Sequence, residues 1–260
     1  MERKPAPAPH EVIIDPPAFT ARIEATARAH GFRVEQFGSV GDTPLLALTK
    51  RASGPRRPRI YLSAGIHGDE PAPPLALLDL LERGAFDARA VWFLCPLLNP
   101  AGFTIRKREN ADGLDLNRDY KALRSLEIQA HARWLQRQPN FAATFHLHED
   151  WEAQGFYLYE LCSVADRSIA RAMIEAVSPH FPIEPSDVID GFAVAERGII
   201  RPVADPLLRD LWPESIYLRA HHTQLGYTIE TPTSRPLAQR IQALSVAIQA
   251  ALHGICERNG

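Results

Sequence analysis

Two short segments of this chain bring histidine close to acidic side chains. In residues 65–70, the imidazole of His67 and the carboxylate of Glu70 stand three positions apart, and two glycines share the stretch. If the backbone turns between such a pair, both side chains can reach one metal ion, and glycine adopts such turns without steric conflict. Three prolines within residues 71–74 suit the first turn of a helix, which can spare its N–H groups. The segment therefore indicates a metal site just before a helix.

The second segment, residues 145–150, ends a predicted strand and contains two histidines. Because side chains alternate along a strand, His146 and His148 lie on the same face. A third ligand from this separate strand end would leave one zinc position open for water, as a catalytic site requires. A ligand histidine also needs a partner for its second ring nitrogen, which the other histidine or a nearby acid could supply. The residues alone do not decide which histidine binds metal.

Two further polar groups lie near predicted strand ends. Residues 106–110 and 113–118 bring arginines and asparagines into one loop, where guanidinium and amide donors suit a carboxylate ligand. Residues 226–230 read as a short strand that the carboxylate of Glu230 closes. Each group alone has an ordinary explanation as a polar loop or a strand end. Beside the histidine segments, they point to one site for a metal ion and a carboxylate.

The elements that must position these groups alternate between strands and helices. Helices are predicted over residues 19–30, 75–83, 120–138, 163–177 and 236–258, and strands over 33–37, 45–49, 59–64, 90–98, 141–147, 156–161 and 226–230. This alternation predicts a single α/β domain with a mostly parallel or mixed twisted sheet and helices on both faces. Ligand sites of such sheets lie outside the carboxyl ends of the strands, where the polar groups fall. Residues 182–213 lack a clear period and are interpreted as a long functional loop.

Taken in order, these motifs resemble those of the zinc carboxypeptidases, the relatives of carboxypeptidases A and B, and of the related desuccinylases and aspartoacylases. That superfamily carries His-x-x-Glu, Asn-Pro-x-Gly, Asp-x-Asn-Arg, a strand-end histidine and a strand-end glutamate. Here the series stands as His67/Glu70, residues 99–102, residues 115–118, His148 and Glu230. Any one motif is weak, but five in order at strand ends are a specific signal. The resemblance implies a zinc-carboxypeptidase-like α/β/α fold.

The resemblance also implies a role for each matching residue and one zinc ion per chain. Zinc lowers the pKa of a bound water and polarises the scissile carbonyl. A carboxylate base accepts the proton of that water. A cationic side chain, together with zinc, stabilises the negative charge that develops on the carbonyl oxygen. The matching residues are His67, Glu70 and His148 as zinc ligands, Glu230 as general base, Arg108 at the oxyanion, and Asn117 with Arg118 as the pair that holds the substrate's terminal carboxylate.

Several positions leave alternatives or depart from the family pattern. His148 is preferred to His146 as ligand because the family's ligand follows a small apolar residue, and His146 then stands where relatives carry Asp or Ser. Arg106 is the alternative to Arg108 at the oxyanion. The tyrosine that closes over substrate in classical members has no secure match, with Tyr217 and Tyr227 as candidates. The Glu-Asp pair after the histidine ligand is unlike their Ser-Tyr.

Net charge and cysteine content indicate which partners and which cellular compartment this chain is expected to have. With a formal net charge of -2 among 260 residues, neither nucleic acid nor a membrane surface is indicated as a partner. Residues 1–9 are predicted to form a flexible arm without signal-peptide features, ahead of one zinc-dependent hydrolase domain over 10–260. The cysteines are odd in number and far apart, at Cys95, Cys162 and Cys256. That usage fits a reducing cytoplasm, with Cys95 as a buried thiol.

The sequence is compatible with three functions. The first is a metallocarboxypeptidase that removes the C-terminal residue of a small peptide, which the Asn-Pro-x-Gly and Arg-x-Asn stretches favour. The second is a deacylase that cleaves an N-acyl amino acid with the same zinc chemistry. The third is a zinc-binding relative without catalysis, against which the retained Glu230 argues, because pure binding would not need a base. The expected substrate is a small molecule with a free carboxylate.

Overall fold

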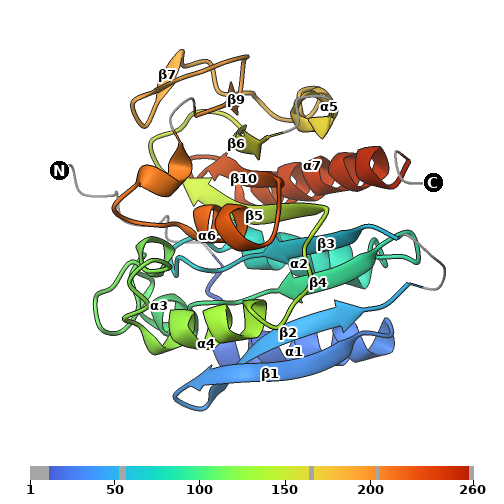
Figure 1. The fold of residues 1–260 in the computed structure, drawn as a ribbon, viewed down its shortest axis with the longest axis vertical. Helices are drawn as coiled ribbons and strands as arrows, with labels where there is room; N and C mark the ends of the chain where they lie inside the picture. The colour runs from blue at the N-terminus through green and yellow to red at the C-terminus, as the bar shows by residue number, and fades with distance from the viewer. Residues whose placement is uncertain (1–11, 53–56, 164–166, 203–204, 258–260) are drawn as a thin grey trace.

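The computed structural model describes residues 12–52, 57–163, 167–202 and 205–257. The arm predicted for residues 1–9 lies outside these ranges. The helices are α1 (Pro16–Ala29), α2 (Ala72–Glu82), α3 (Pro100–Ile105), α4 (Leu126–Leu135), α5 (Ala170–Val177), α6 (Glu214–His221) and α7 (Leu237–Glu257), with short 3-10 turns at Leu116–Arg118 and Pro206–Leu208. The strands are β1 (Arg33–Val40), β2 (Thr43–Lys50), β3 (Arg59–Ser63), β4 (Val91–Cys95), β5 (Ala143–Asp150), β6 (Tyr157–Cys162), β7 (Val188–Ile189), β8 (Phe192–Ala193), β9 (Ile199–Ile200) and β10 (Leu225–Pro232) (Figure 1).

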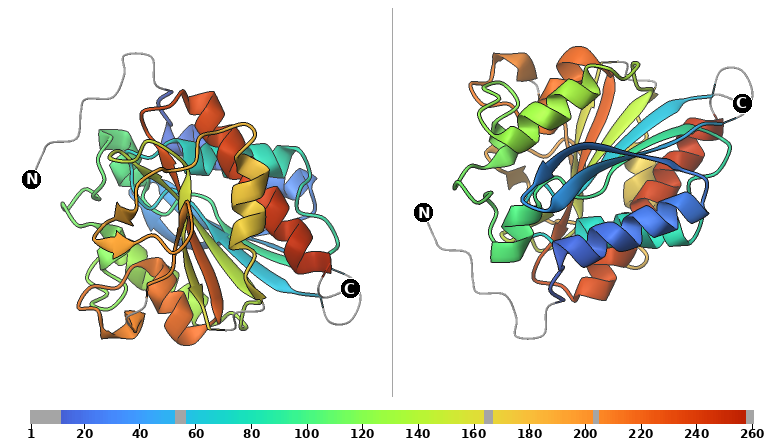
Figure 2. Two further views of the ribbon diagram at one scale, coloured as in Figure 1. Left: turned by 90° about the horizontal axis from the view of Figure 1, so that it is seen from above. Right: turned by 90° about the horizontal axis from the view of Figure 1, so that it is seen from below.

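An eight-stranded mixed sheet forms the centre of the molecule, in the order β1-β2-β4-β3-β5-β10-β6-β9. The inner strands β4, β3, β5 and β10 run parallel, whereas β1 and β2 pair antiparallel, as do β2 with β4 and β6 with β10. Helices cover both faces of this twisted sheet (Figure 2). The predicted single α/β domain with a mixed sheet is therefore confirmed.

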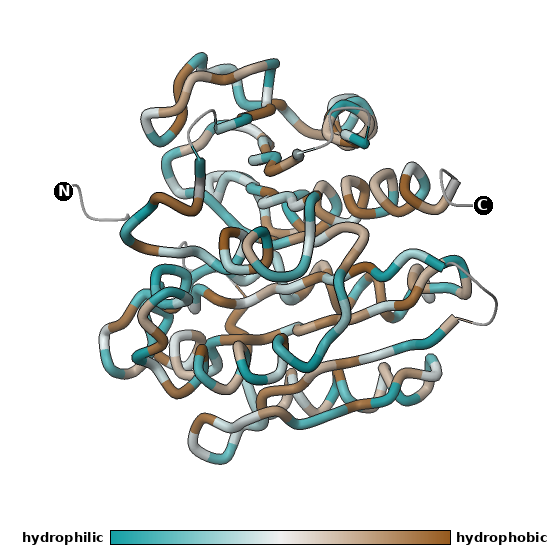
Figure 3. The backbone as a smooth tube through the Cα atoms, viewed as in Figure 1, coloured by the Kyte–Doolittle hydropathy of each residue, from teal (hydrophilic) through white to brown (hydrophobic). Residues whose placement is uncertain are grey.

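A hydrophobic core lies on each side of the sheet. The larger core joins apolar residues of α1, α2, α5 and α7 to one face, and the smaller joins α4 and α6 to the other. Hydrophobic residues recur along the inner strands and α7 (Figure 3). Burial on both faces explains the continuous apolar run at β4, where Cys95 is fully buried as predicted. Both faces of the sheet are covered by apolar residues, so a polar site can form at the carboxyl ends of the strands.

Helix α4 begins later than predicted, at Leu126 rather than at residue 120. The carboxylate of Asp119 accepts hydrogen bonds from the backbone N–H groups of Arg124 and Ser125, and Leu123 has a left-handed φ of 53°. These contacts hold residues 120–125 in a turn, and the Ser125 hydroxyl then caps the helix by accepting from the Ile128 N–H. The apolar periodicity of the sequence continues through this turn, which the buried carboxylate of Asp119 holds, so the predicted helix starts too early.

Two short helices were not predicted. In α3 the signal was present, because Asn99 caps the helix and Pro100 occupies its first position. Helix α6 has no side-chain cap and follows the Pro- and Gly-rich region without a clear apolar period. In the described residues of the region predicted as a loop, 182–202 and 205–213, the regular elements are the short strands β7 to β9 and the 3-10 turn Pro206–Leu208. None of the described helices has the length and apolar character needed to cross a membrane.

Candidate metal centre and substrate cavity

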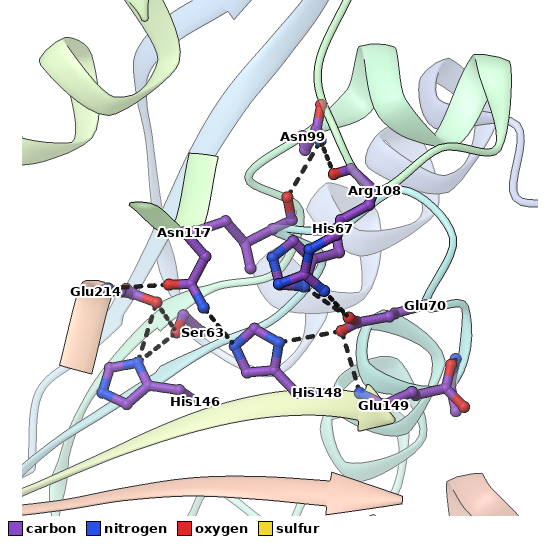
Figure 4. A network of polar contacts seen from close by, with 12 residues as sticks. Ser63, His67, Glu70, Asn99, Arg108, Asn117, His146, His148, Glu149 and Glu214 are labelled. Atoms are coloured by element: carbon purple, nitrogen blue, oxygen red, sulfur yellow. Dashed lines mark hydrogen bonds and ion pairs between the residues drawn. The ribbon is translucent and has the colours of Figure 1, made fainter. Parts of the chain in front are cut away.

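Two neighbouring parallel strands bring the candidate ligands together. Strands β3 and β5 pair with Ser63 opposite His146, so the loop after β3 meets the end of β5. Nδ1 of His67 lies 2.6 Å from Glu70 Oε1, and Nδ1 of His148 lies 3.1 Å from Glu70 Oε2 (Figure 4). The candidate ligand atoms of these three residues lie within 4.8 Å of one another. The sequence-predicted set His67, Glu70 and His148 is thus one cluster in space.

The donor set of this cluster fits a divalent transition metal. Two imidazole nitrogens and one carboxylate are the donors of known catalytic zinc sites, which keep a further position for water. All three side chains are buried, and the charges of His67 and His148 hold the pKa of Glu70 well below its usual range despite its burial. A bound cation would take the place of those histidine charges, because metal-binding imidazoles are neutral while the carboxylate stays ionised.

His146 lies on the same strand face but takes different partners. Its Nδ1 lies 3.0 Å from both Ser63 Oγ and Glu214 Oε2, so the ring is turned toward the α6 side of β5 (Figure 4). This geometry favours His148 as the ligand and leaves His146 behind the metal centre. Strand alternation predicted the shared face but carried no information about Glu214, which comes from a distant helix.

An acid at the start of the Asp-x-Asn-Arg motif completes the surroundings of His67. Asp115 Oδ1 lies 3.2 Å from His67 Nε2, the ring nitrogen that faces away from Glu70. Asp115 Oδ2 accepts a 2.9 Å hydrogen bond from Arg108 Nε, and both positive partners lower the pKa of Asp115, outweighing its burial. A carboxylate on the second nitrogen fixes the orientation of a ligand histidine. Asp115 was predicted only as part of the Asp-x-Asn-Arg motif, and its contact with His67 was not predicted.

The Asn-Pro-x-Gly stretch supports the loop that carries His67. Asn99 Nδ2 donates to the carbonyl oxygens of Ile66 and Arg108, which ties the histidine loop to the arginine loop (Figure 4). A Cβ on Gly68 would lie 1.9 Å from the backbone carbon of Gly102. The two loops therefore approach so closely that only glycine fits at this contact. The motif positions the site rather than reacting in it.

The Glu-Asp pair after His148 departs from the family pattern, and the structure gives Glu149 a positioning role. Its backbone N–H donates to Glu70 Oε2 (3.1 Å), and its carboxylate accepts from the Ala72 N–H at the start of α2. The same buried carboxylate pairs with Arg240 of α7. Burial raises the pKa of Glu149 to about 7 against the opposing effect of Arg240. The contacts of Glu149 with Ala72 and Arg240 join β5 to α2 and α7 directly beside the candidate ligand Glu70.

A cavity of 390 Å³ opens over the candidate metal centre. Glu230 lines it and stands beside His148 in the parallel register of β10 with β5. Burial and the negative charges of Glu70 and Asp150 raise the pKa of Glu230 well above its usual range. A divalent cation held by the ligands would oppose that effect, since it would be the largest charge in the site. The predicted base thus lies next to the predicted metal.

The predicted substrate-binding residues occupy the same cavity. Arg108, Asn117 and Arg118 all line it, and Arg108 Nη1 lies 3.6 Å from Glu70 Oε1. Arg118 is half-buried and donates to the Asn117 carbonyl oxygen (2.9 Å). Arg106 instead caps α3 with an exposed side chain and does not line the cavity. Of the two oxyanion candidates, only Arg108 therefore faces the site.

The two tyrosines proposed to close over substrate do not line the cavity. Tyr227 is buried, with its hydroxyl bonded to Glu160, and Tyr217 packs against His221. Tyr157 and Tyr159 of β6 line the cavity instead. Neither was predicted, because their positions beside Glu230 and Thr228 follow from the pairing of β6 with β10.

Comparison with known proteins places the chain in a family. Residues 56–193 match the pattern of the succinylglutamate desuccinylase/aspartoacylase catalytic domain, which is just over half of the 260 residues. The chain belongs to this family. The matched residues include the three candidate ligands and both substrate-binding candidates, whereas Glu230 lies beyond the matched stretch.

Similar structures extend the likeness over nearly the whole chain. A protein of Shewanella amazonensis SB2B, assigned as a metallopeptidase, is 26% identical, covers 90% of this chain and 91% of that one, and has a TM-score of 0.78. A metallo-carboxypeptidase of Burkholderia cenocepacia shares the fold at 20% identity and a TM-score of 0.69, over 91% of this chain and 68% of that one. Carboxypeptidase SOL1 of Arabidopsis thaliana is 35% identical over an alignment of 112 residues, and the alignment covers 35% of this chain and 23% of that protein. The match thus spans about a quarter of that curated relative's length. The succinylglutamate desuccinylase/aspartoacylase family and these likenesses together indicate a metal-dependent hydrolase.

Proposed function

We propose that this chain is a zinc-dependent metallocarboxypeptidase that hydrolyses the C-terminal amide bond of small peptides. The observation that carries the proposal is one cavity lined both by a His-Glu-His cluster with Glu230 and by Arg118 with Asn117. A hydrolytic centre beside donors for a carboxylate suits a substrate cleaved next to its free end. One zinc ion per chain is bound by His67, Glu70 and His148.

The residues of the cavity divide the chemistry between them. Zinc, when bound, supplies a water of lowered pKa and polarises the scissile carbonyl. Glu230 accepts a proton from the attacking water and returns it to the leaving amine. Arg108 stabilises the negative charge that develops on the carbonyl oxygen. Arg118 and Asn117 hold the terminal carboxylate, which places the scissile bond over the centre.

A deacylase that cleaves N-acyl amino acids is the second candidate, and the family match supports it, because desuccinylases and aspartoacylases give the family its name. Both reactions break an amide next to an amino acid that bears a free carboxylate. They differ in the group on the other side of the bond, which is a peptide in one case and a simple acyl chain in the other. The cavity's donors for a carboxylate serve either substrate.

A paired hydrolysis screen separates the two candidates. We expect the zinc-loaded protein to hydrolyse N-blocked dipeptides faster than N-succinyl, N-acetyl and other simple N-acyl amino acids, and a chelator to abolish both activities. Product amino acids are measured by chromatography, and activity is restored by adding zinc after the chelator is removed. Faster cleavage of the N-acyl amino acids would replace the peptidase proposal with the deacylase. Undiminished hydrolysis after complete metal removal would contradict both.

Replacing Arg118 with Ala should lower kcat/KM for a free-acid dipeptide by about 10- to 100-fold, the loss of a hydrogen bond to a charged group. Asp115 is engaged by Arg108 and His67, so an ion pair with Asp115 is not needed to explain Arg118. The melting temperature should change little, since the side chain is half-exposed.

Amidating the dipeptide's C-terminus should cause a similar loss in the wild type and little further loss in the Arg118→Ala variant, because both changes remove one interaction. Arg209, which also lines the cavity, offers the matched control, and Arg209→Ala should leave the acid-to-amide preference intact. Equal turnover of the two dipeptides by the wild type would rule out this role. Arg201, on the long loop, would not replace it, because it already donates to Glu160 and Glu196.

A further inference from the structure

A buried carboxylate behind the cavity has no part in the roles assigned above. Glu214, the first residue of α6, is only 1% exposed. Its Oε1 accepts from the Tyr61 hydroxyl (2.5 Å). Its Oε2 accepts from the Ser63 hydroxyl (2.6 Å) (Figure 4). His146 Nδ1 adds a third contact to Oε2 at 3.0 Å. A buried charge is tolerated only with such partners, so this site is built around an anion.

The hydrogen-bond network around Glu214 is compatible with one set of donor and acceptor roles. Tyr61 donates its proton to Glu214, so Tyr61 must accept from His131 Nε2, which lies 3.0 Å away. His131 Nδ1 then accepts from the Tyr120 hydroxyl at 2.7 Å. Burial alone would raise the pKa of Glu214, but the charge and hydrogen bond of His146 lower it to about 2. The carboxylate is therefore a charged anchor for the start of α6, tied to β3, β5 and α4.

The same residue reaches the cavity through its backbone. The N–H of Glu214 donates a 2.9 Å hydrogen bond to Asn117 Oδ1. An N–H can only donate, so the oxygen of the Asn117 amide must face α6 and the NH₂ group must face the other way. Asn117 Nδ2 lies 3.4 Å from His148 Nε2, on the side of the candidate metal centre (Figure 4). Asn117 itself is 7% exposed and lines the cavity.

We propose that Glu214 is a positioning residue for substrate recognition: its anchored N–H holds the Asn117 amide so that the N–H not directed at His148, rather than the carbonyl oxygen, is left to face the substrate's carboxylate. This inference rests on the proposed function. An amide turned over would present oxygen lone pairs to an anion and repel it. The buried anchor therefore sets which charge the cavity accepts, although Glu214 never touches the substrate.

The variant Glu214→Gln tests the anchor. Glutamine keeps the size but turns one acceptor oxygen into a donor that faces other donors, so the start of α6 loses its fixed place. We expect one zinc per chain to be retained and kcat/KM for an N-benzoyl dipeptide acid to fall at least about tenfold, mainly through KM. Turnover of the same dipeptide as its C-terminal amide should change little. The acid-to-amide preference should therefore shrink, and calorimetric affinity for the free-acid product should fall in parallel.

Glu184→Gln is the matched control. Glu184 is also a buried carboxylate, bonded to the backbone N–H groups of Gln154 and Gly155, but it does not line the cavity or contact Asn117. It should cost stability without changing the acid-to-amide preference. If Glu214→Gln does not fold, the double variant Tyr61→Phe/Ser63→Ala removes two of the anchor's donors and has the same expected result.

The outcomes separate this inference from the proposed function. A wild type that does not distinguish acid from amide overturns the proposed function. A wild type that does distinguish them, with an unchanged preference in a folded, zinc-loaded Glu214→Gln protein, overturns only the positioning role. An equal loss of preference in Glu184→Gln would also overturn it, because the effect would then follow from stability alone.

Discussion

Glu230→Gln should retain zinc and lose about 10²- to 10⁴-fold in kcat, the usual contribution of a general base. The amide keeps the size of the side chain but cannot accept the proton of the attacking water. Glu230 lies beside His148 across the β5–β10 pair and lines the cavity, so its carboxylate is placed next to the candidate metal centre. Burial and the negative charges of Glu70 and Asp150 raise its pKa, and a cation held by the three ligands would oppose that shift and favour the ionised form that acts as a base. Turnover is measured on the zinc-loaded variant with the best dipeptide substrate.

Glu152→Gln provides the control for this experiment. Glu152 is an exposed acid at the same cavity, so its replacement changes the local charge equally but removes no predicted base. Its turnover should stay within a few-fold of the wild type. Near-wild-type kcat in a Glu230→Gln protein that binds one zinc per chain would show that another group takes the proton.

His148→Ala should lower the zinc content from one per chain to near zero, with complete loss of activity. The three candidate ligands are buried and converge, so removing one leaves only two protein donors, fewer than catalytic zinc sites use. Metal content is measured by elemental analysis after dialysis, and circular dichroism checks that the variant is folded. The loss should be greater than that from any change in the surroundings of the ligands.

His146→Ala is the comparison that decides between the two histidines of β5. His146 contacts Ser63 and Glu214 rather than Glu70, so its removal should lower stability while zinc is retained. Breaking a buried pair with Glu214 leaves an uncompensated charge, which explains the expected loss of stability. If His146→Ala loses zinc and His148→Ala keeps it, the ligand assignment is reversed.

The local sequence pattern was enough to predict that His67 and Glu70 lie together before a helix. The His-x-x-Glu stretch, its glycines and the prolines that begin α2 are neighbours in the chain, and their joint geometry follows from short-range stereochemistry. The parallel arrangement then places the ends of β3, β5 and β10 at one edge, as α/β alternation predicted. The sequence favours Arg108 over Arg106 without deciding between them, because both lie in one loop. In the structure Arg108 contacts Asp115 and Glu70 and lines the cavity, whereas Arg106 is exposed.

The contacts that hold the site in place could not be predicted in the same way. Asp115 supports His67 across 48 positions, and Glu214 meets His146 across 68. Each of these acids reads as an ordinary polar residue in its own segment. Helix α6 has no side-chain cap and no clear apolar periodicity, so nothing in the local sequence pointed to Glu214 as the residue that orients Asn117.

From the sequence alone follow the α/β class, the five motifs in order and the identity of the residues that could bind metal and substrate. Those features depend on side-chain type and on spacing along the chain, which the sequence records directly. Only the tertiary structure decided which histidine of β5 faces Glu70, which arginine faces the cavity and how the Asn117 amide is turned. These depend on hydrogen bonds between elements far apart in the chain, and such partners are set by how helices and strands pack rather than by any local pattern.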